Sequence, residues 1–179
     1  GPGAEAAVRA ALGDAPQAVH GLTQNENGMA LRLPGECFEL LVAPERAQSV
    51  WKSLAQSCKP VGSGRWDWHL IRAGIPTVLP GTQEEFVPQM ANFEIIGGVN
   101  FKKGCYPGQE IVARTQYLGK LKRRLYLAHI ASDNAPVPGD ALYSADMQEQ
   151  ASGMIANAQP APGGGFDVLA VIQSSSAEA

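Results

Sequence analysis

The chain has 179 residues, of which 45% are hydrophobic, and this is enough to bury one large core or two small ones. It contains no run of about 18 apolar residues and no signal-peptide pattern, so we expect neither a transmembrane helix nor a secretory leader. The formal net charge of -3 gives no overall attraction to nucleic acid or to an anionic membrane.

The three cysteines of the chain set further limits. Cys37, Cys58 and Cys105 cannot all pair within the chain, and none of them lies in a C-x-x-C pair. This pattern argues against a disulfide framework and against a zinc ribbon. No cluster of histidine, cysteine and carboxylate residues has metal-ligand spacing either. We therefore expect a reducing cytoplasm and no metal site.

The first part of the chain predicts a β-hairpin followed by a strand and a helix. Residues 17–23 and 28–33 are strand-like and are separated by a polar segment typical of a hairpin connection. Residues 37–42 predict a buried strand, which leads into a helix because Pro44 suits a first helical turn. Four apolar residues of this helix are spaced to share one face: Ala47, Val50, Trp51 and Leu54.

The middle of the chain predicts two further helices joined by an irregular segment. The first is expected over residues 65–73 and ends at Gly74. Residues 81–98 mix helical patches with a proline and a Gly-Gly pair, so we expect them to be partly irregular. The second helix is expected over residues 108–117, where Pro107 suits the first turn.

The sequence changes in character after about residue 120. Short strand-like segments follow one another and are separated by turns rich in proline and glycine, which is typical of a small antiparallel barrel or sandwich. We therefore predict an α+β fold, with an α/β sandwich-like domain over residues 1–118 and a small C-terminal antiparallel β-barrel over residues 119–179.

A basic segment lies between Phe101 and Tyr126. It holds seven of the 14 lysine and arginine residues of the chain, against the single acidic residue Glu110. The seven are Lys102, Lys103, Arg114, Lys120, Lys122, Arg123 and Arg124. Such a segment is either a solvated face or an anion-binding surface.

Cys105 lies in the stretch KGCYPGQE, between two glycines and shortly before an expected helix. The positive end of a helix, together with Lys102 and Lys103, favours a thiolate, so the stretch suits a reactive thiol or an anion site. Gly104 and Gly108 allow a ligand to approach the backbone closely. The alternative is that Cys105 is a small buried hydrophobic residue, as free cysteines often are.

Other catalytic chemistry is poorly indicated. His69 and His129 are distant from the cysteine in the sequence, so a cysteine-protease or acyl-transfer mechanism lacks its base. Trp66 and Trp68 could form the wall of a pocket for a flat ligand such as a pterin, although tryptophans more often serve in packing.

The run over residues 73–110 resembles the signature region of the YgfZ family of folate-binding proteins. It contains an Ala-Gly-Ile-Pro element, a Phe-x-Pro-Gln element at residues 86–89 and the motif Lys-Gly-Cys-Tyr-x-Gly-Gln-Glu at residues 103–110. All seven specified positions of the last motif match. Residues 112–114 and 122–126 also resemble the family.

The resemblance implies a fold related to the T-protein of the glycine cleavage system, a tetrahydrofolate-dependent aminomethyltransferase. It implies a ring-like protein of three parts with a central folate pocket, which acts in the assembly or repair of iron-sulfur clusters. In bacteria the family is linked to the iron-sulfur enzymes that thiolate tRNA. Tetrahydrofolate or a derivative is the expected cofactor, folate and iron-sulfur enzymes are the expected partners, and direct contact with tRNA is left open.

The resemblance also implies site residues. Cys105 is the functional thiol, and four neighbours shape its surroundings: Lys103, Tyr106, Gln109 and Glu110. The residue types add five expected contacts to the cofactor: Gly104, Gly108, Arg114, Arg72 and Trp68. Arg114 suits a carboxylate through a bidentate fork, Arg72 could meet the glutamate tail of a folate, and Trp68 could lie beside the pterin.

Two departures separate the chain from the family pattern. Whole family members are longer, and we expect this chain to be their middle and C-terminal portions, without the N-terminal part that contributes much of the folate pocket. Arg72 stands where the T-protein relatives have a glutamate before their Ala-Gly pair, which weighs against aminomethyl transfer.

Two functions stay open. One is a folate-binding accessory protein for iron-sulfur cluster maintenance, and the other is a tetrahydrofolate-dependent aminomethyltransferase. The Lys-Gly-Cys-Tyr block favours the first, because the relatives that catalyse aminomethyl transfer lack it.

Overall fold

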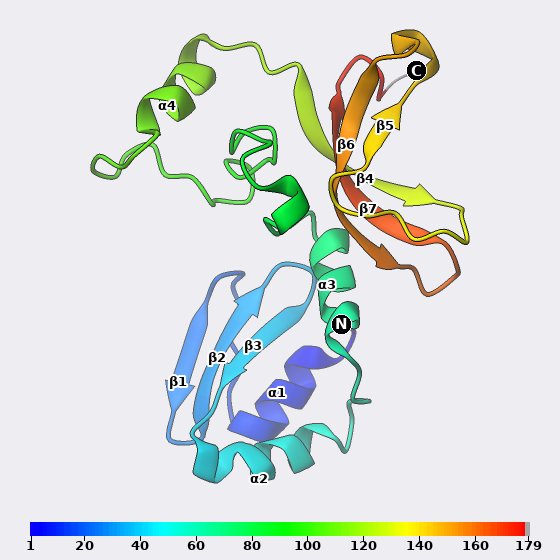
Figure 1. Ribbon diagram of the computed structural model, residues 1–179. Coiled ribbons are helices and arrows are strands. Elements are labelled where there is room, and N and C mark those ends of the chain that lie inside the picture. The colour runs from blue at the N-terminus through cyan, green and yellow to red at the C-terminus, as the bar shows by residue number, and fades with distance from the viewer. Residues whose placement is uncertain (178–179) are drawn as a thin grey trace. The chain divides into compact units, whose positions relative to one another are not determined.

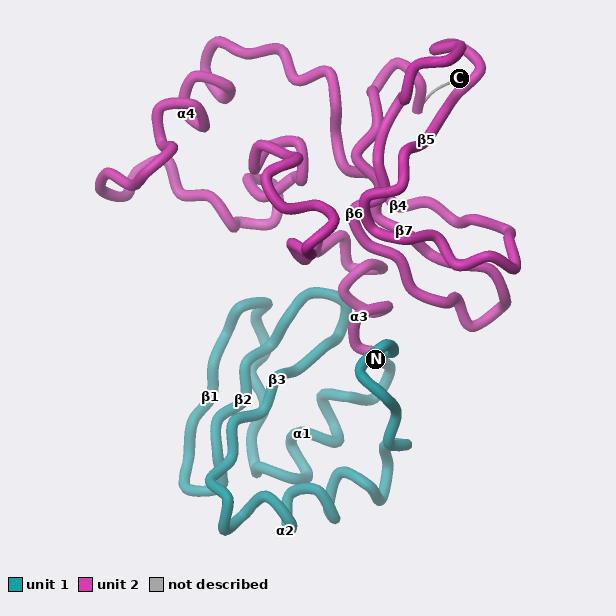
Figure 2. The backbone as a smooth tube through the Cα atoms, in the orientation of Figure 1, with its two compact units in different colours: residues 1–65 teal, residues 66–179 magenta. Residues whose placement is uncertain are grey.

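The computed structural model describes residues 1–177, which fall into two compact units (Figure 2). The first unit is Gly1–Arg65, and the second begins at Trp66. The domain boundary expected after residue 118 lies inside the second unit and stays a prediction. The last two residues of that expected C-terminal domain lie outside the described part of the chain.

The first unit is a three-stranded antiparallel sheet with two helices packed on it (Figure 1). Its elements in chain order are α1 (Ala4–Leu12), β1 (Leu22–Asn25), β2 (Gly28–Leu33), β3 (Cys37–Leu41) and α2 (Pro44–Leu54). β2 lies between β1 and β3, and its Ala30 is completely buried. Val8 and Leu12 of α1 and Val50 of α2 complete the core around it.

The predicted hairpin, third strand and following helix are confirmed, with two differences. β1 begins at Leu22 rather than at residue 17, because residues 18–21 turn and the His20 φ angle is 63°. The prediction that the apolar residues of α2 share one face is only half correct. Val50 and Leu54 pack in the core, whereas Trp51 is 61% exposed.

Helix α1 is an element that the sequence analysis did not predict. Five of its nine residues are alanine, the strongest helix former, and Val8 and Leu12 are spaced to face one side. These signals were sufficient to indicate a helix. Gly13 ends it with a φ angle of 87°, and its amide donates to the Arg9 carbonyl.

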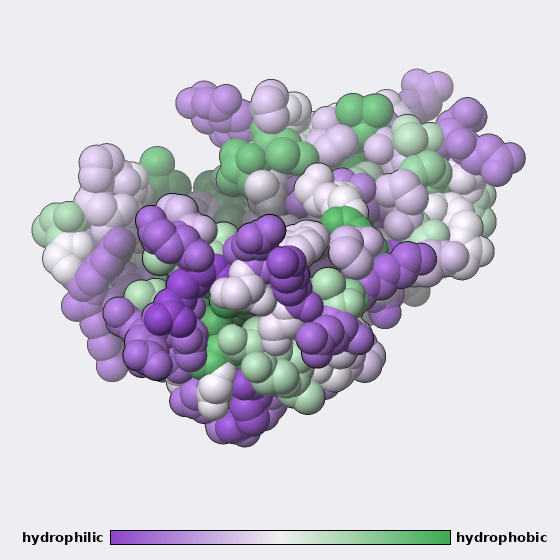
Figure 3. Space-filling view, turned by 90° about the horizontal axis from the view of Figure 1, so that it is seen from below, coloured by the Kyte–Doolittle hydropathy of each residue, from purple (hydrophilic) through white to green (hydrophobic). Residues whose placement is uncertain are grey.

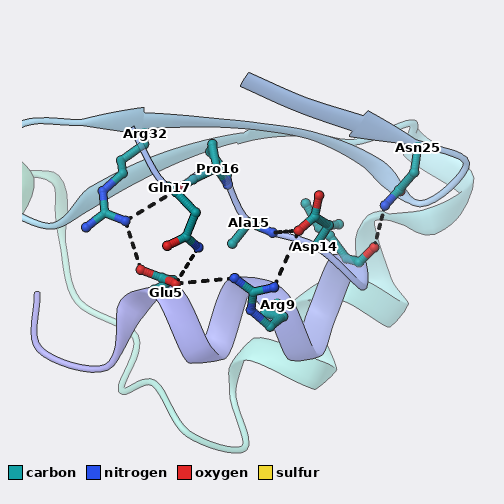
Figure 4. A network of polar contacts seen from close by, with 9 residues as sticks. Glu5, Arg9, Asp14, Ala15, Pro16, Gln17, Asn25 and Arg32 are labelled. Atoms are coloured by element: carbon teal, nitrogen blue, oxygen red, sulfur yellow. Dashed lines mark hydrogen bonds and ion pairs between the residues drawn. The ribbon is translucent and has the colours of Figure 1, made fainter. Parts of the chain in front are cut away.

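A polar network ties the exposed side of α1 to the sheet (Figure 4). The Glu5 carboxylate accepts hydrogen bonds from Gln17 and Arg32, each at 2.8 Å, and from Arg9 at 3.3 Å. These hydrogen bonds outweigh desolvation and lower the pKa of Glu5 below its ordinary value. At the other end of the helix, the Asn25 amide donates to the Leu12 carbonyl at 2.7 Å.

The second unit is built on a four-stranded antiparallel sheet in the order β4-β7-β6-β5. Its elements are α3 (Ser63–Arg72), whose first three residues belong to the first unit, α4 (Gln109–Leu118), β4 (Arg123–Ile130), β5 (Ala141–Tyr143), β6 (Ala151–Pro160) and β7 (Phe166–Gln173), with short 3-10 helices at Pro80–Thr82 and Ala145–Met147. The β4–β7 register runs from Arg123 opposite Gln173 to Ile130 opposite Phe166.

The closed C-terminal barrel expected from the sequence is corrected to this single sheet. Among the described residues, β4 and β5 lie at its two edges and do not pair with each other. β5 has only three residues, and closure requires pairing at every edge. The sheet instead buries one face under other elements, where Ile71, Phe86 and Met90 pack with Leu125 and Leu169.

The helices predicted for the middle of the chain are confirmed within two residues at each end. The segment between them is irregular as expected and contains the 3-10 helix at Pro80–Thr82. Pro107 is a correction, because it lies outside α4 rather than in its first turn. Gly108, with a φ angle of 83°, is the N-cap.

No helix within residues 1–177 is long and apolar enough to cross a membrane. In the view of Figure 3, hydrophobic residues lie in separate groups among hydrophilic ones. Scattered apolar side chains of this kind are normal on a protein surface.

Candidate functional site

The motif that the sequence analysis singled out forms a turn at the start of α4, which we call the cysteine loop (residues 103–110). The Tyr106 amide donates to Gln109 Oε1 at 3.3 Å, and the Gln109 amide donates to the Tyr106 carbonyl at 3.2 Å. Gly108 has a positive φ angle that a residue with a side chain adopts only with strain. The order of residues in the motif therefore closes the turn that directly follows Cys105.

The Cys105 side chain is exposed, which decides against its interpretation as a buried hydrophobic residue. Within residues 1–177 it makes no disulfide and no hydrogen bond that would occupy the sulfur. Of the other two cysteines, Cys58 is exposed and Cys37 is buried. Cys105 is thus accessible to a ligand or a reagent, and Cys58 offers a control with similar exposure.

A cavity of about 280 Å³ lies beside the cysteine loop. Phe93 and Val112 form part of its wall, and the loop contributes Lys103 and Tyr106. Lys103 Nζ lies 4.7 Å from the centroid of the Tyr106 ring, so the cation rests on the aromatic face. The cavity combines apolar and aromatic walls with one positive charge.

Gln89 and Arg124 hold the irregular segment before the cysteine loop in place. Gln89 is completely buried, and its Nε2 donates to the Val112 carbonyl of α4 at 2.6 Å. Arg124 donates to the Gln89 carbonyl at 3.1 Å and to Asn92 Oδ1 at 3.3 Å, and it forms an ion pair with Glu94. Arg124 is therefore a structural residue and is not free to bind a ligand, unlike its neighbours in the basic segment.

A second group of side chains surrounds Asp167 of β7, and we call Trp68, Arg72, His129 and Asp167 the Asp167 cluster. Trp68 Nε1 donates to Asp167 Oδ2 at 2.8 Å, and His129 Nδ1 lies 2.9 Å from Oδ1. Arg72 Nη1 lies 3.8 Å from Oδ2. The Asp167 side chain is 8% exposed, whereas those of Arg72 and His129 are each 50% exposed.

The charge state of Asp167 follows from this environment. Burial alone raises the pKa of the carboxyl group. The hydrogen bonds from His129 and Trp68 and the positive charge of Arg72 outweigh burial, so the pKa lies below its ordinary value. Asp167 is consequently an ionised carboxylate that orients a tryptophan and a histidine.

The structure places the expected site residues in two groups. Trp68 and Arg72 belong to the Asp167 cluster, while Lys103 and Tyr106 line the cavity beside the cysteine loop. Gln109 is half-buried in the turn, and the others are exposed on the loop or on α4: Gly104, Cys105, Gly108, Glu110 and Arg114. The contacts described above do not join the two groups.

Sequence reasoning missed Asp167 and set His129 aside. A single acidic residue within the apolar run FDVLAVI was a usable signal, because a buried carboxylate is rare unless it is paired. The partners themselves were not visible in the sequence, since Trp68 is 99 residues away and His129 is 38 residues away.

The residue types beside the cysteine loop fit part of a folate. Phe93 offers an aromatic ring to a flat ligand, and Lys103, which rests on the Tyr106 ring, offers a charge to a carboxylate. The volume of about 280 Å³ lies just below the range of about 300–1,000 Å³ that is usual for drug-sized ligands. The cavity therefore suits one ring rather than a whole folate. Within the described residues, no cluster of His, Cys, Asp or Glu is arranged to hold a metal ion.

No family model matches the chain. Curated relatives named "tRNA-modifying protein YgfZ" do match it over 144 residues, or 79% of the chain. The protein from Pectobacterium carotovorum subsp. carotovorum is 34% identical, and the match covers 43% of its length. Those from Yersinia enterocolitica and Yersinia pestis are each 35% identical, and the match covers 44% of their length.

The chain belongs to the YgfZ family. The resemblance inferred from the cysteine loop and the Phe-x-Pro-Gln element is thereby confirmed. The YgfZ relatives are more than twice as long as the part that matches this chain, so the activity of a whole YgfZ protein is a matter of proposal here.

Proposed function

We propose that this YgfZ chain belongs to a folate-binding accessory protein that supports tRNA modification by iron-sulfur enzymes in the cytoplasm. Its contribution is to iron-sulfur cluster assembly or repair, with Cys105 as the functional thiol. The observation that carries the proposal is the exposed Cys105, directly before a closed turn, in a chain similar to proteins named for tRNA modification.

The cysteine loop supports this role through its geometry. The Tyr106–Gln109 hydrogen bonds fix the turn that follows Cys105. The Cys105 side chain is exposed to solvent and forms no disulfide among the described residues. Lys103 is held against the Tyr106 ring at the cavity. This places a positive charge at the cavity, where it can attract an anionic ligand.

Tetrahydrofolate or a derivative is the cofactor that we propose, and it would supply a carrier of one-carbon groups with an anionic glutamate tail. Lys103 and Tyr106 would meet it at the cavity, and Arg114, exposed on α4, would meet a carboxylate. Trp68 and Arg72 offer a ring and a cation in the Asp167 cluster. None of the contacts described above favours the aminomethyltransferase alternative.

We expect Cys105→Ser to abolish the function while Cys58→Ser leaves it intact. The test uses cells of the source organism that lack the gene and receive the full-length protein or either variant. Thiolated nucleosides in their tRNA are measured by mass spectrometry, and protein abundance is checked in parallel. Cys105→Ser should match the deletion strain, because a hydroxyl does not replace a thiol as nucleophile or redox group. Wild-type nucleoside levels with Cys105→Ser would overturn the role proposed for this cysteine.

A further inference from the structure

A second and larger cavity lies at the C-terminal end of α4. Its volume is about 510 Å³, within the range of about 300–1,000 Å³ that accommodates a drug-sized ligand. It is bounded by Thr115, by the segment 119–122 that leads into β4, and by Gln173 at the end of β7. No acidic side chain is among the described residues that line it.

Three positive charges line this basic cavity: Lys120, Lys122 and Arg123. All three are exposed, and none forms an ion pair within residues 1–177, in contrast to the neighbouring Arg124. The C-terminus of α4 contributes about half a negative charge, which three full positive charges exceed. A concave wall with charges of one sign concentrates their field, so the cavity selects an anion.

Backbone hydrogen bonds anchor the segment that carries these cations. The Ser174 amide donates to the Lys122 carbonyl at 2.8 Å, and Arg123 lies opposite Gln173 in the β4–β7 register. The Gly119 amide donates to the Thr115 carbonyl at 3.2 Å. The cations thus stand on a scaffold anchored to β7 at one side and to α4 at the other.

An exposed aromatic residue precedes the segment that lines the basic cavity. Tyr117 is 72% exposed and lies two residues before Gly119, which lines the cavity. Its ring makes an edge contact with Phe101 at 6.2 Å between centroids, and most of its surface stays open to solvent. Several cations and an exposed aromatic ring within one short segment are features that suit single-stranded nucleic acid, since phosphates meet the cations and a base stacks on the ring.

We infer that the basic cavity and Tyr117 form a binding site for single-stranded RNA. Phosphates of the RNA backbone lie at Lys120, Lys122 and Arg123, and one base stacks on Tyr117. The inference rests on the proposed function only in its choice of RNA as the nucleic acid. It requires neither folate nor Cys105.

The test measures binding of a fluorescein-labelled single-stranded RNA to the full-length protein by fluorescence anisotropy at several salt concentrations. Replacing Lys120 and Lys122 together with glutamine should weaken binding and lower the slope of log affinity against log salt by about 1.4, because each phosphate that is no longer neutralised accounts for about 0.7. The matched control replaces Lys52 and Lys59, which are exposed lysines of the first unit, and should leave the slope unchanged.

Tyr117→Ala should weaken RNA binding by about fivefold or more without changing the salt slope, because stacking involves no counterion release. Inorganic phosphate serves as the competitor that identifies a site for small phosphate ligands. If phosphate displaces the RNA and Tyr117→Ala has no effect, the assignment to RNA is wrong. If the Lys120/Lys122 variant behaves like the Lys52/Lys59 control, the basic cavity is not the site.

The same variants separate this inference from the proposed function. Tetrahydrofolate affinity and tRNA thiolation are measured alongside RNA binding. A wild-type protein that binds no RNA but shows Cys105-dependent thiolation overturns the RNA site alone. RNA binding that depends on Lys120, Lys122 and Tyr117, without any effect of Cys105→Ser on thiolation, overturns the proposed function alone.

Discussion

Asp167→Ala is expected to destabilise the second unit by about 3 kcal/mol. Hydrogen bonds to a charged group contribute about 1.5–3 kcal/mol each, and removal of the carboxylate leaves the Trp68 indole N–H and His129 without their acceptor. The substitution also removes the counter-charge of Arg72. Urea unfolding at neutral pH gives the difference in the free energy of unfolding.

Asp133→Ala is the matched control, because Asp133 is an exposed aspartate of the same unit. It should change the free energy of unfolding by no more than about 0.5 kcal/mol. If the two variants unfold at the same urea concentration, the Asp167 cluster does not stabilise the fold.

The effect of Asp167 should also depend on pH in a defined direction. The pKa of its carboxyl group is lower in the folded protein than in the unfolded chain. Its stabilisation is therefore fully present above the ordinary pKa of aspartate and is lost as the pH falls through the lower, folded value. The difference in the free energy of unfolding between wild type and Asp167→Ala should shrink as the pH falls below the ordinary pKa of aspartate. A difference that grows over this pH range would contradict the lowered pKa of Asp167.

Arg124→Met is expected to cost about 3 kcal/mol for a different reason. The Glu94 side chain is 13% exposed, and one of its oxygens already lacks a hydrogen-bond partner among the described residues. Removing the guanidinium leaves this carboxylate without its counter-charge. An ion pair that loses only one partner is strongly destabilised, because the remaining charge is uncompensated and shielded from water. The substitution also removes the hydrogen bonds to Gln89 and Asn92.

Arg123→Met provides the control for this prediction. Arg123 precedes Arg124 in the same strand, but it is exposed and forms no ion pair within residues 1–177, so its replacement should cost about 0.5 kcal/mol or less. Hydrogen exchange adds a local readout. The amides of residues 87–98 should lose protection in Arg124→Met, and unchanged protection there would show that Arg124 does not anchor the segment.

Elements that depend on local signals were predictable from the sequence. β2 was predicted at its observed bounds, and α2 began at Pro44 as expected, because hydrophobic period and proline position are local properties. The cysteine loop was recognised from its match to a family motif, which is also local in the sequence. Its Tyr106–Gln109 hydrogen bonds span only three residues.

Features that depend on long-range pairing were not predictable in this way. The C-terminal strands were expected to close into a barrel, but closure depends on which edges meet in space, and the edges β4 and β5 stay unpaired with each other. Arg124 was grouped with the free cations, because its partner Glu94 lies 30 residues away in an irregular segment. The Asp167 cluster escaped notice because the fold, rather than the sequence order, assembles it.

The central claim is that Cys105 works beside a bound folate, and its alkylation rate tests this most directly. The full-length protein is treated with iodoacetamide under anaerobic conditions, with and without tetrahydrofolate, and each cysteine is followed by mass spectrometry. Without ligand, exposed Cys105 and Cys58 should both be labelled, and buried Cys37 should react slowest. Saturating tetrahydrofolate should slow the labelling of Cys105 and leave Cys58 unchanged. A Cys105 rate that tetrahydrofolate does not alter, at concentrations where calorimetry shows the protein to be saturated, would contradict the claim.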